Sequence, residues 1–117
     1  MNIEDVREYC LAKKAASESF PFDNTVLAFK VMDRMFAVLW LTDPDKLVLK
    51  CDPEYAEELR EQYDAIEPAW HFNKRYWNQL RMSHISGELL RHLIDHSYDE
   101  VVKKFPKKKK EELDKLK

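Results

Sequence analysis

Glycine is almost absent from this sequence, with Gly87 as the one example among 117 residues. Glycine-rich phosphate loops, dinucleotide-binding fingerprints and the nucleophile turn of α/β-hydrolases each require at least two glycines at fixed spacings. These enzyme classes are excluded, and no other catalytic signature takes their place. We therefore expect a binding protein without a cofactor rather than an enzyme. Most turns must use Asp, Asn, Pro or Ser.

Cysteine is scarce as well, and Cys10 and Cys51 are too far apart in the sequence for a CxxC motif. Each lies in a segment with regular apolar spacing, so we expect two buried free thiols that pack as small hydrophobic side chains. A disulfide would require Cα atoms within about 7 Å, which the sequence leaves open. No histidine accompanies Cys10 in its segment, so a nucleophilic role is not indicated.

Long apolar runs are missing too. No segment approaches the roughly 18 apolar residues of a membrane span. The first ten residues are charged and amphipathic, unlike the apolar stretch of a signal peptide. We expect a cytoplasmic protein with no membrane contact.

The residues that are present indicate one globular domain, since 44% are hydrophobic and 36% are charged. We assign residues 1–105 to a single domain, expected to be a monomer, and residues 106–117 to a lysine-rich extension. The net charge of −2 argues against non-specific binding to nucleic acid or membranes. The distribution is uneven, however, because residues 68–87 contain no acidic residue at all.

Apolar periodicity predicts an α+β fold. Residues 2–16 form an amphipathic helix with Asn2 as its N-cap. Strands follow at 25–31 and 35–41, joined by a turn at Asp33-Arg34, and a third strand at 47–51 follows a turn at 43–45. In this register Phe29 lies opposite Val38. The side chains expected on the face toward the helices are then Leu27, Phe29, Val31, Phe36, Val38 and Trp40.

The second half predicts a helix, a strand and a helix. Asp52-Pro53 gives an N-cap and a first-turn proline, and Pro68 breaks the chain. The strand at 76–82 places Asn78, Leu80 and Met82 on one face and Trp77, Gln79 and Arg81 on the other. Ser86 caps a last helix, which Pro106 interrupts before a frayed tail at 107–117. The predicted order α-β-β-β-α-β-α, with short turns between strands, favours a two-layer sandwich with helices on one face of an antiparallel sheet.

The strongest candidate for function is the segment from Trp70 to Gln79, in which cations, aromatic rings and amides alternate. Lys and Arg neutralise phosphates, amides read base edges, and rings stack on bases. The alternative is that the rings pack the core while the cations are solvated. The candidate nucleic-acid-binding residues are His71, Asn73, Lys74, Arg75, Trp77, Asn78, Gln79 and Arg81.

Three other groupings are weaker. His92 and His96 have the i,i+4 spacing of a zinc pair but lack supporting ligands, so we expect solvated or capping histidines and no metal. The paired carboxylates lie at exposed positions and are expected to be solubilising charges. The lysine run 107–110 can add affinity for nucleic acid or simply solubilise a helix end.

The chain resembles the MmcQ/YjbR family along nearly its whole length. The matching segments are 4–10 (EDVREYC), 20–22 (FPF), 29–31 (FKV), 35–37 (MFA), 49–54 (LKCDPE), 59–63 (LREQY), 71–78 (HFNKRYWN) and 93–99 (LIDHSYD). The resemblance implies a frataxin-like (CyaY-like) fold and a DNA-binding role in which two β-hairpin wings present the surface. The distinctive motif corresponds to His71, Asn73, Lys74, Trp77 and Asn78.

Two other functions stay open. In one, the acidic helix face at Glu54, Glu57, Glu58 and Glu61 engages a basic protein partner. In the other, His71, Asn73 and Lys74 form a pocket for a small anion, with an acidic iron-binding surface as a variant suggested by fold analogy alone.

Overall fold

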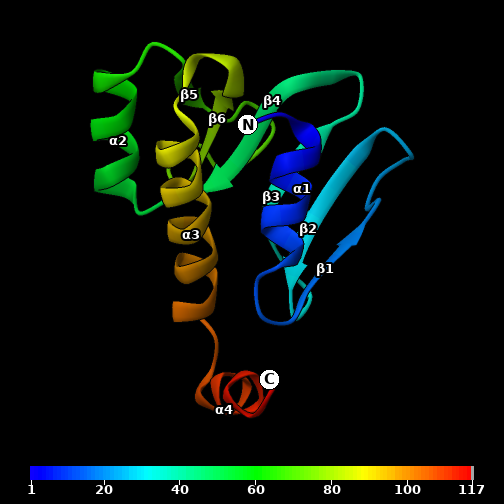
Figure 1. Ribbon diagram of the computed structural model, residues 1–117. Helices are drawn as coiled ribbons and strands as arrows, with labels where there is room; N and C mark the ends of the chain where they lie inside the picture. The colour runs from blue at the N-terminus through cyan, green and yellow to red at the C-terminus, as the bar shows by residue number, and fades with distance from the viewer. Residues whose placement is uncertain (117) are drawn as a thin grey trace.

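The computed structural model describes residues 1–116 and shows four α-helices against one six-stranded antiparallel sheet (Figure 1). Helix α1 spans Ile3–Leu11, α2 Pro53–Gln62, α3 Gly87–Lys103 and α4 Lys107–Lys115, and a short 3₁₀ turn, η1, spans Met82–His84. The strands are β1 Ala16–Ser19, β2 Val26–Val31, β3 Arg34–Trp40, β4 Asp43–Lys50, β5 Ile66–Pro68 and β6 Trp77–Arg81. Their order across the sheet is β1-β2-β3-β4-β6-β5.

Each of the three predicted helix starts is confirmed by a side-chain cap. The Asn2 side chain accepts a hydrogen bond from the Asp5 amide, and the Asp5 carboxylate accepts one from the Asn2 amide, which completes a capping box. Asp52 caps α2 ahead of Pro53, and Ser86 caps α3. These caps satisfy backbone N–H groups that a helix leaves without partners, so local sequence alone sets the three boundaries.

Besides the short turn η1, three elements were not predicted. The first helix ends at Leu11 rather than near residue 16, and the chain turns at Ala15 to form β1 as an edge strand on β2. The three-residue β5 pairs with β6. The predicted frayed tail is instead α4, and it buries Leu113 in the main core. Pairing or packing with other elements stabilises β1, β5 and α4. The apolar periodicity within each short segment does not reveal these contacts.

The predicted hairpin register was wrong. The turn is Met32-Asp33, both with positive φ, and a bulge follows, so that Phe29 pairs with Ala37 and Ala28 with Val38. A one-residue shift moves strand side chains to the opposite face. Val38 and Trp40 therefore lie on the face away from the helices, contrary to the prediction.

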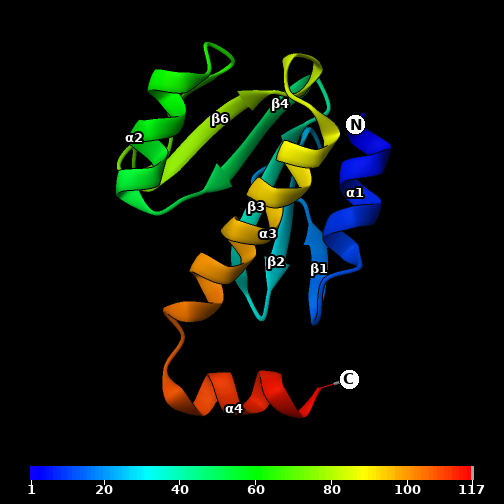
Figure 2. The same cartoon turned by 60° about the vertical axis from the view of Figure 1, so that its left-hand side comes forward.

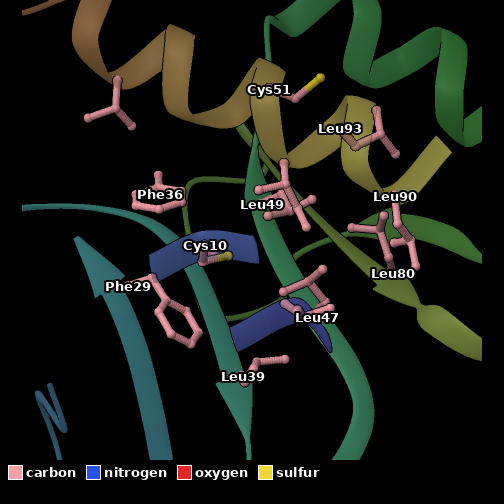
Figure 3. Packing of buried hydrophobic residues seen from close by; sticks show 14 of the residues in the cluster. Cys10, Phe29, Phe36, Leu39, Leu47, Leu49, Cys51, Leu80, Leu90 and Leu93 are labelled. Atoms are coloured by element: carbon pink, nitrogen blue, oxygen red, sulfur yellow. The ribbon is translucent and has the colours of Figure 1, made fainter. Parts of the chain in front are cut away.

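The main core lies between the helices and one face of the sheet. Figure 3 shows Cys10 of α1, Phe29 of β2, Leu49 of β4 and Leu90 of α3 gathered in this layer. Helices α1, α2 and α3 all contribute to it, which confirms the predicted α+β arrangement with these helices on one side of the sheet. No helix within residues 1–116 is both long and apolar enough to cross a membrane.

We call the other side of the sheet the open face. A smaller apolar cluster of short side chains lies there, made by Val26, Ala28, Val38, Val48 and Ala69. Met35, Trp40, Phe72 and Trp77 pack against it while partly exposed.

One buried hydroxyl joins α3 to two strands. Ser97 Oγ donates to the Phe36 carbonyl at 2.5 Å and accepts from the Lys50 amide at 2.9 Å. Ser97 is fully buried, so water cannot replace either bond.

We expect Ser97→Ala to lower the free energy of unfolding by about 1–3 kcal/mol, because it leaves two strand backbone groups without their partner. Urea denaturation measures the change. Ser17→Ala, at an exposed position on β1, is the matched control and should change stability by less than about 0.5 kcal/mol. Equal stability of the two variants would contradict this role for Ser97.

Candidate nucleic-acid interface

The residues between β5 and β6 fold into a compact turn that packs against the open face. The Phe72 amide donates to the Ala69 carbonyl, and the Tyr76 amide donates to the Asn73 carbonyl. Asn73 Oδ1 also accepts from the Arg75 amide at 3.1 Å, as an Asx turn requires. Ala69 is buried. We call residues 69–76 the aromatic turn.

Three half-buried rings form a continuous row on the open face. The Phe72 ring centre lies 5.2 Å from that of Trp77 in a tilted arrangement, and 6.3 Å from that of Trp40, edge to face. Rings prefer such geometries to a face-to-face sandwich. The row thus joins β3, the aromatic turn and β6.

Cations lie over the exposed faces of these rings and their neighbours. Lys46 Nζ is 4.1 Å from the ring centre of Trp40, and Lys50 Nζ is 6.0 Å from that of Trp77. On the aromatic turn, Lys74 Nζ lies 4.2 Å from the Trp70 ring centre, and Trp70 is 55% exposed. These are cation–π distances. The alternation of cations and rings therefore exists in three dimensions as well as along the sequence.

Asn78, one of the candidate base readers, is buried and has a structural role. Its Oδ1 accepts from Arg60 Nε at 2.6 Å, and its amide nitrogen donates to the Ala56 carbonyl at 3.4 Å. Arg60 also donates to the Lys74 carbonyl. Asn78 and Arg60 thus connect α2, β6 and the aromatic turn, and the Asn78 amide is not presented at the surface.

Side chains of both charge signs lie near the C-terminal end of β6. Gln79 faces the open side, as predicted, but it donates to Glu67. Arg81 is exposed and shares a depression of about 120 Å³ with Lys46, Asp64 and Glu67. The two carboxylates offset part of the positive charge of Arg81 and Lys46 there.

The eight sequence candidates therefore separate by location. His71, Asn73, Lys74 and Arg75 are exposed on the aromatic turn, and Trp77 and Gln79 are half-buried on the open face. Arg81 is exposed beside acids, and Asn78 is buried. Sequence reasoning missed Trp40, Lys46 and Lys50. The alternation Lys46-Val48-Lys50 on a strand was a usable signal, because alternate residues share a face.

Of the two histidines His92 and His96, the second has a structural role. His96 Nε2 accepts from the Asp52 amide at 3.2 Å, so it caps the start of α2 as the capping interpretation predicted. Both imidazoles lie edge-on to Tyr55. Within residues 1–116, no group of three His, Cys, Asp or Glu side chains converges as a metal centre requires.

Both thiols are free and buried. Burial raises the pKa of Cys10 to about 12 and, together with the nearby Asp52 carboxylate, that of Cys51 to about 12. A thiol with so high a pKa carries almost no thiolate near neutral pH, and the thiolate is the reactive form.

We expect neither thiol to react with a disulfide reagent such as DTNB in the native protein at pH 7–8, and both to react in strong denaturant. The absorbance of the released thiolate measures this. Rapid release of one equivalent from the folded protein would show that one thiol is accessible and activated.

We expect Asn78→Ala to destabilise the protein by about 2–3 kcal/mol, because it strips the half-buried Arg60 of a charge-assisted hydrogen bond. Asn73→Ala, at an exposed position, should cost less than about 1 kcal/mol in the same denaturation experiment. If Asn78→Ala kept full stability and instead lost nucleic-acid affinity, the side chain would be a base reader after all.

Comparison with known proteins gives one consistent result. The sequence model of a family described as YjbR matches residues 11–100. Uncharacterised YjbR proteins of Escherichia coli K12 and O157:H7 are each 33% identical over 115 residues, covering 94% of this chain and 95% of each relative.

Two solved structures have a similar fold. A Deinococcus radiodurans protein, described with the DUF419 domain, is 39% identical with a TM-score of 0.88, covering 95% of this chain and 86% of its own. A Pseudomonas syringae protein is 22% identical with a TM-score of 0.71, covering 83% of this chain and 96% of its own. At that identity the second likeness concerns the fold alone.

Proposed function

This chain belongs to the MmcQ/YjbR family, and from that premise we propose that it is a DNA-binding module that uses the open face and the aromatic turn. The proposal includes the frataxin-like class of fold, which the packing of α1 and α3 on one face of an antiparallel sheet supports. It takes Lys46, Lys74 and Arg75 as phosphate contacts and Trp40, Phe72 and Trp77 as the stacking surface.

The observation that carries the proposal is the row of three half-exposed rings with cations above two of them. Packing of the core alone does not explain why lysines lie over the rings. Solvation of the lysines alone does not explain why the rings lie next to one another at the surface. Single-stranded nucleic acid uses both groups, because each stacked base contributes about 1–3 kcal/mol and each neutralised phosphate releases counterions.

The rings favour a single strand over a duplex. A flat aromatic surface can stack on bases only where those bases are free of their own partners, as on other sheet-based binding surfaces. The bases of a duplex are already stacked inside the helix. The proposed ligand is therefore single-stranded DNA, and duplex DNA and RNA of the same sequence serve as comparison ligands.

We expect Lys46→Glu and Lys74→Glu each to weaken binding to a mixed-sequence single-stranded oligonucleotide by about tenfold at low salt, the effect of losing one charge-assisted contact. Each should also reduce the slope of log affinity against log salt by about 0.7. Fluorescence anisotropy of a labelled oligonucleotide across a salt series measures both quantities.

The matched control is Arg91→Glu, which makes the same charge change at an exposed position on α3. Its affinity should stay within about twofold of the parent protein. Trp40→Leu tests the rings separately, and it should weaken binding with little change in the salt slope. The proposal fails if all four variants bind equally, or if the parent protein shows no salt-dependent binding.

A further inference from the structure

A groove of about 500 Å³ opens at one end of the sheet, where β3, β4 and β6 meet α3 and α4. Figure 2 shows α4 lying across this end of the molecule, below the last turn of α3. Arg34, Lys50, Lys104 and Lys109 line the groove, and each comes from a different element or helix end. We call it the basic groove. Its size falls in the ordinary range for small-ligand sites.

The cations of the basic groove have no carboxylate partner within residues 1–116. The ion pairs in that part of the chain are Arg7 with Glu18, Lys13 with Asp95, and Lys103 with Glu100. No acidic side chain lines the groove. The nearest acid in the sequence of α3, Glu100, pairs with Lys103 and does not line the groove, so the four cations face the groove without a carboxylate between them.

The electrostatics of Lys50 reflect this arrangement. Partial burial lowers the pKa of its ammonium, and repulsion from Lys104 and from Arg34 lowers it further, against an opposing pull from Glu100. The Lys50 backbone cannot move away, because its amide donates to the buried Ser97 hydroxyl. Fixed cations that repel one another bind an anion that relieves the repulsion.

The rest of the lining is apolar and partly aromatic. Met35, Trp77 and Phe105 form walls next to the cations. Lys109 Nζ lies 4.5 Å from the Phe105 ring centre, and Lys50 faces the Trp77 ring. An inorganic anion would use the cations alone. A ligand with both a charged and a planar apolar part would use the whole groove.

We infer that the basic groove binds a nucleoside polyphosphate, with its phosphates among the four cations and its base against the Trp77 and Met35 wall. A terminal phosphate carries about −1.5 to −2 charges at pH 7, so one phosphate would neutralise about half of the four cations. A triphosphate chain matches the full set.

The inference goes beyond the proposed binding of single strands and does not depend on it. The two surfaces meet at Trp77 and Lys50, but Lys46 and Lys74 lie outside the groove lining, and Lys104 and Lys109 lie off the sheet. Substitutions can therefore address each surface separately.

The test is isothermal titration of the full chain at low salt, with EDTA present, against ATP, ADP, AMP, adenosine and inorganic tripolyphosphate. We expect affinity to fall from ATP to ADP to AMP, with each lost phosphate removing charge-assisted contacts, and adenosine to show no heat of binding. Tripolyphosphate should bind about tenfold more weakly than ATP because it lacks a base. Equal binding of ATP and tripolyphosphate would overturn the assignment of the base, and no binding of ATP would overturn the whole inference.

Variants locate the site. Lys104→Gln and Lys109→Gln should each lower ATP affinity about tenfold, whereas Lys110→Gln, an exposed residue next in α4 that does not line the groove, should leave it within about twofold. Urea denaturation of each variant checks that the fold is intact. Equal losses in the three variants would show that ATP responds to overall charge and not to this groove.

Lys46→Glu separates the two hypotheses, since it should weaken oligonucleotide binding and leave ATP binding unchanged. ATP binding without oligonucleotide binding would remove the proposed function alone. Oligonucleotide binding without ATP binding would remove this inference alone.

Discussion

The attachment of α3 to the middle of the sheet is the constraint on which the other features depend. The Ser97 hydroxyl bonds β3 through the Phe36 carbonyl and β4 through the Lys50 amide, in a site without access to water. Around it, Leu90, Ile94 and Val101 fill the space between helix and sheet. Fixing α3 at this point also fixes its last residues, so Lys104 lies near Lys50 at the end of the sheet where the basic groove opens.

The two faces of the sheet differ because their side chains differ in size. The helix side carries Phe29, Phe36, Leu39 and Leu47, large enough to form a core with the helices. The buried residues of the open face are alanine and valine, and within residues 1–116 no helix contributes to their cluster, so other side chains cover them. The Phe72, Trp40 and Trp77 rings supply that cover while one side of each stays wet. Half-exposed rings near lysines follow from this packing, and they give the open face its capacity to bind a charged, planar ligand.

A feature of the site could be predicted when the residues that determine it lie close together in the sequence, and could not when they lie far apart. The faces of β6 were correctly predicted, because alternation along one strand places Trp77 and Gln79 opposite Leu80. The role of Asn78 was missed, since its partner Arg60 lies on another element and the two are joined only by folding. Trp40 was placed on the wrong face because the bulge near Phe36 shifts the register by one residue, and a bulge has no reliable signature in a single sequence.

The sequence by itself determined the α+β class, the three capped helix starts and the acid-free segment at 68–87, because each follows from residues close together in the chain. Tertiary structure alone decided that Trp40 lies on the open face, that residues 107–115 form a helix, and that four cations from separate elements share one groove. The physical reason is that strand pairing and helix docking are set by contacts between segments distant in sequence. A charge cluster assembled from such segments exists only once they have packed.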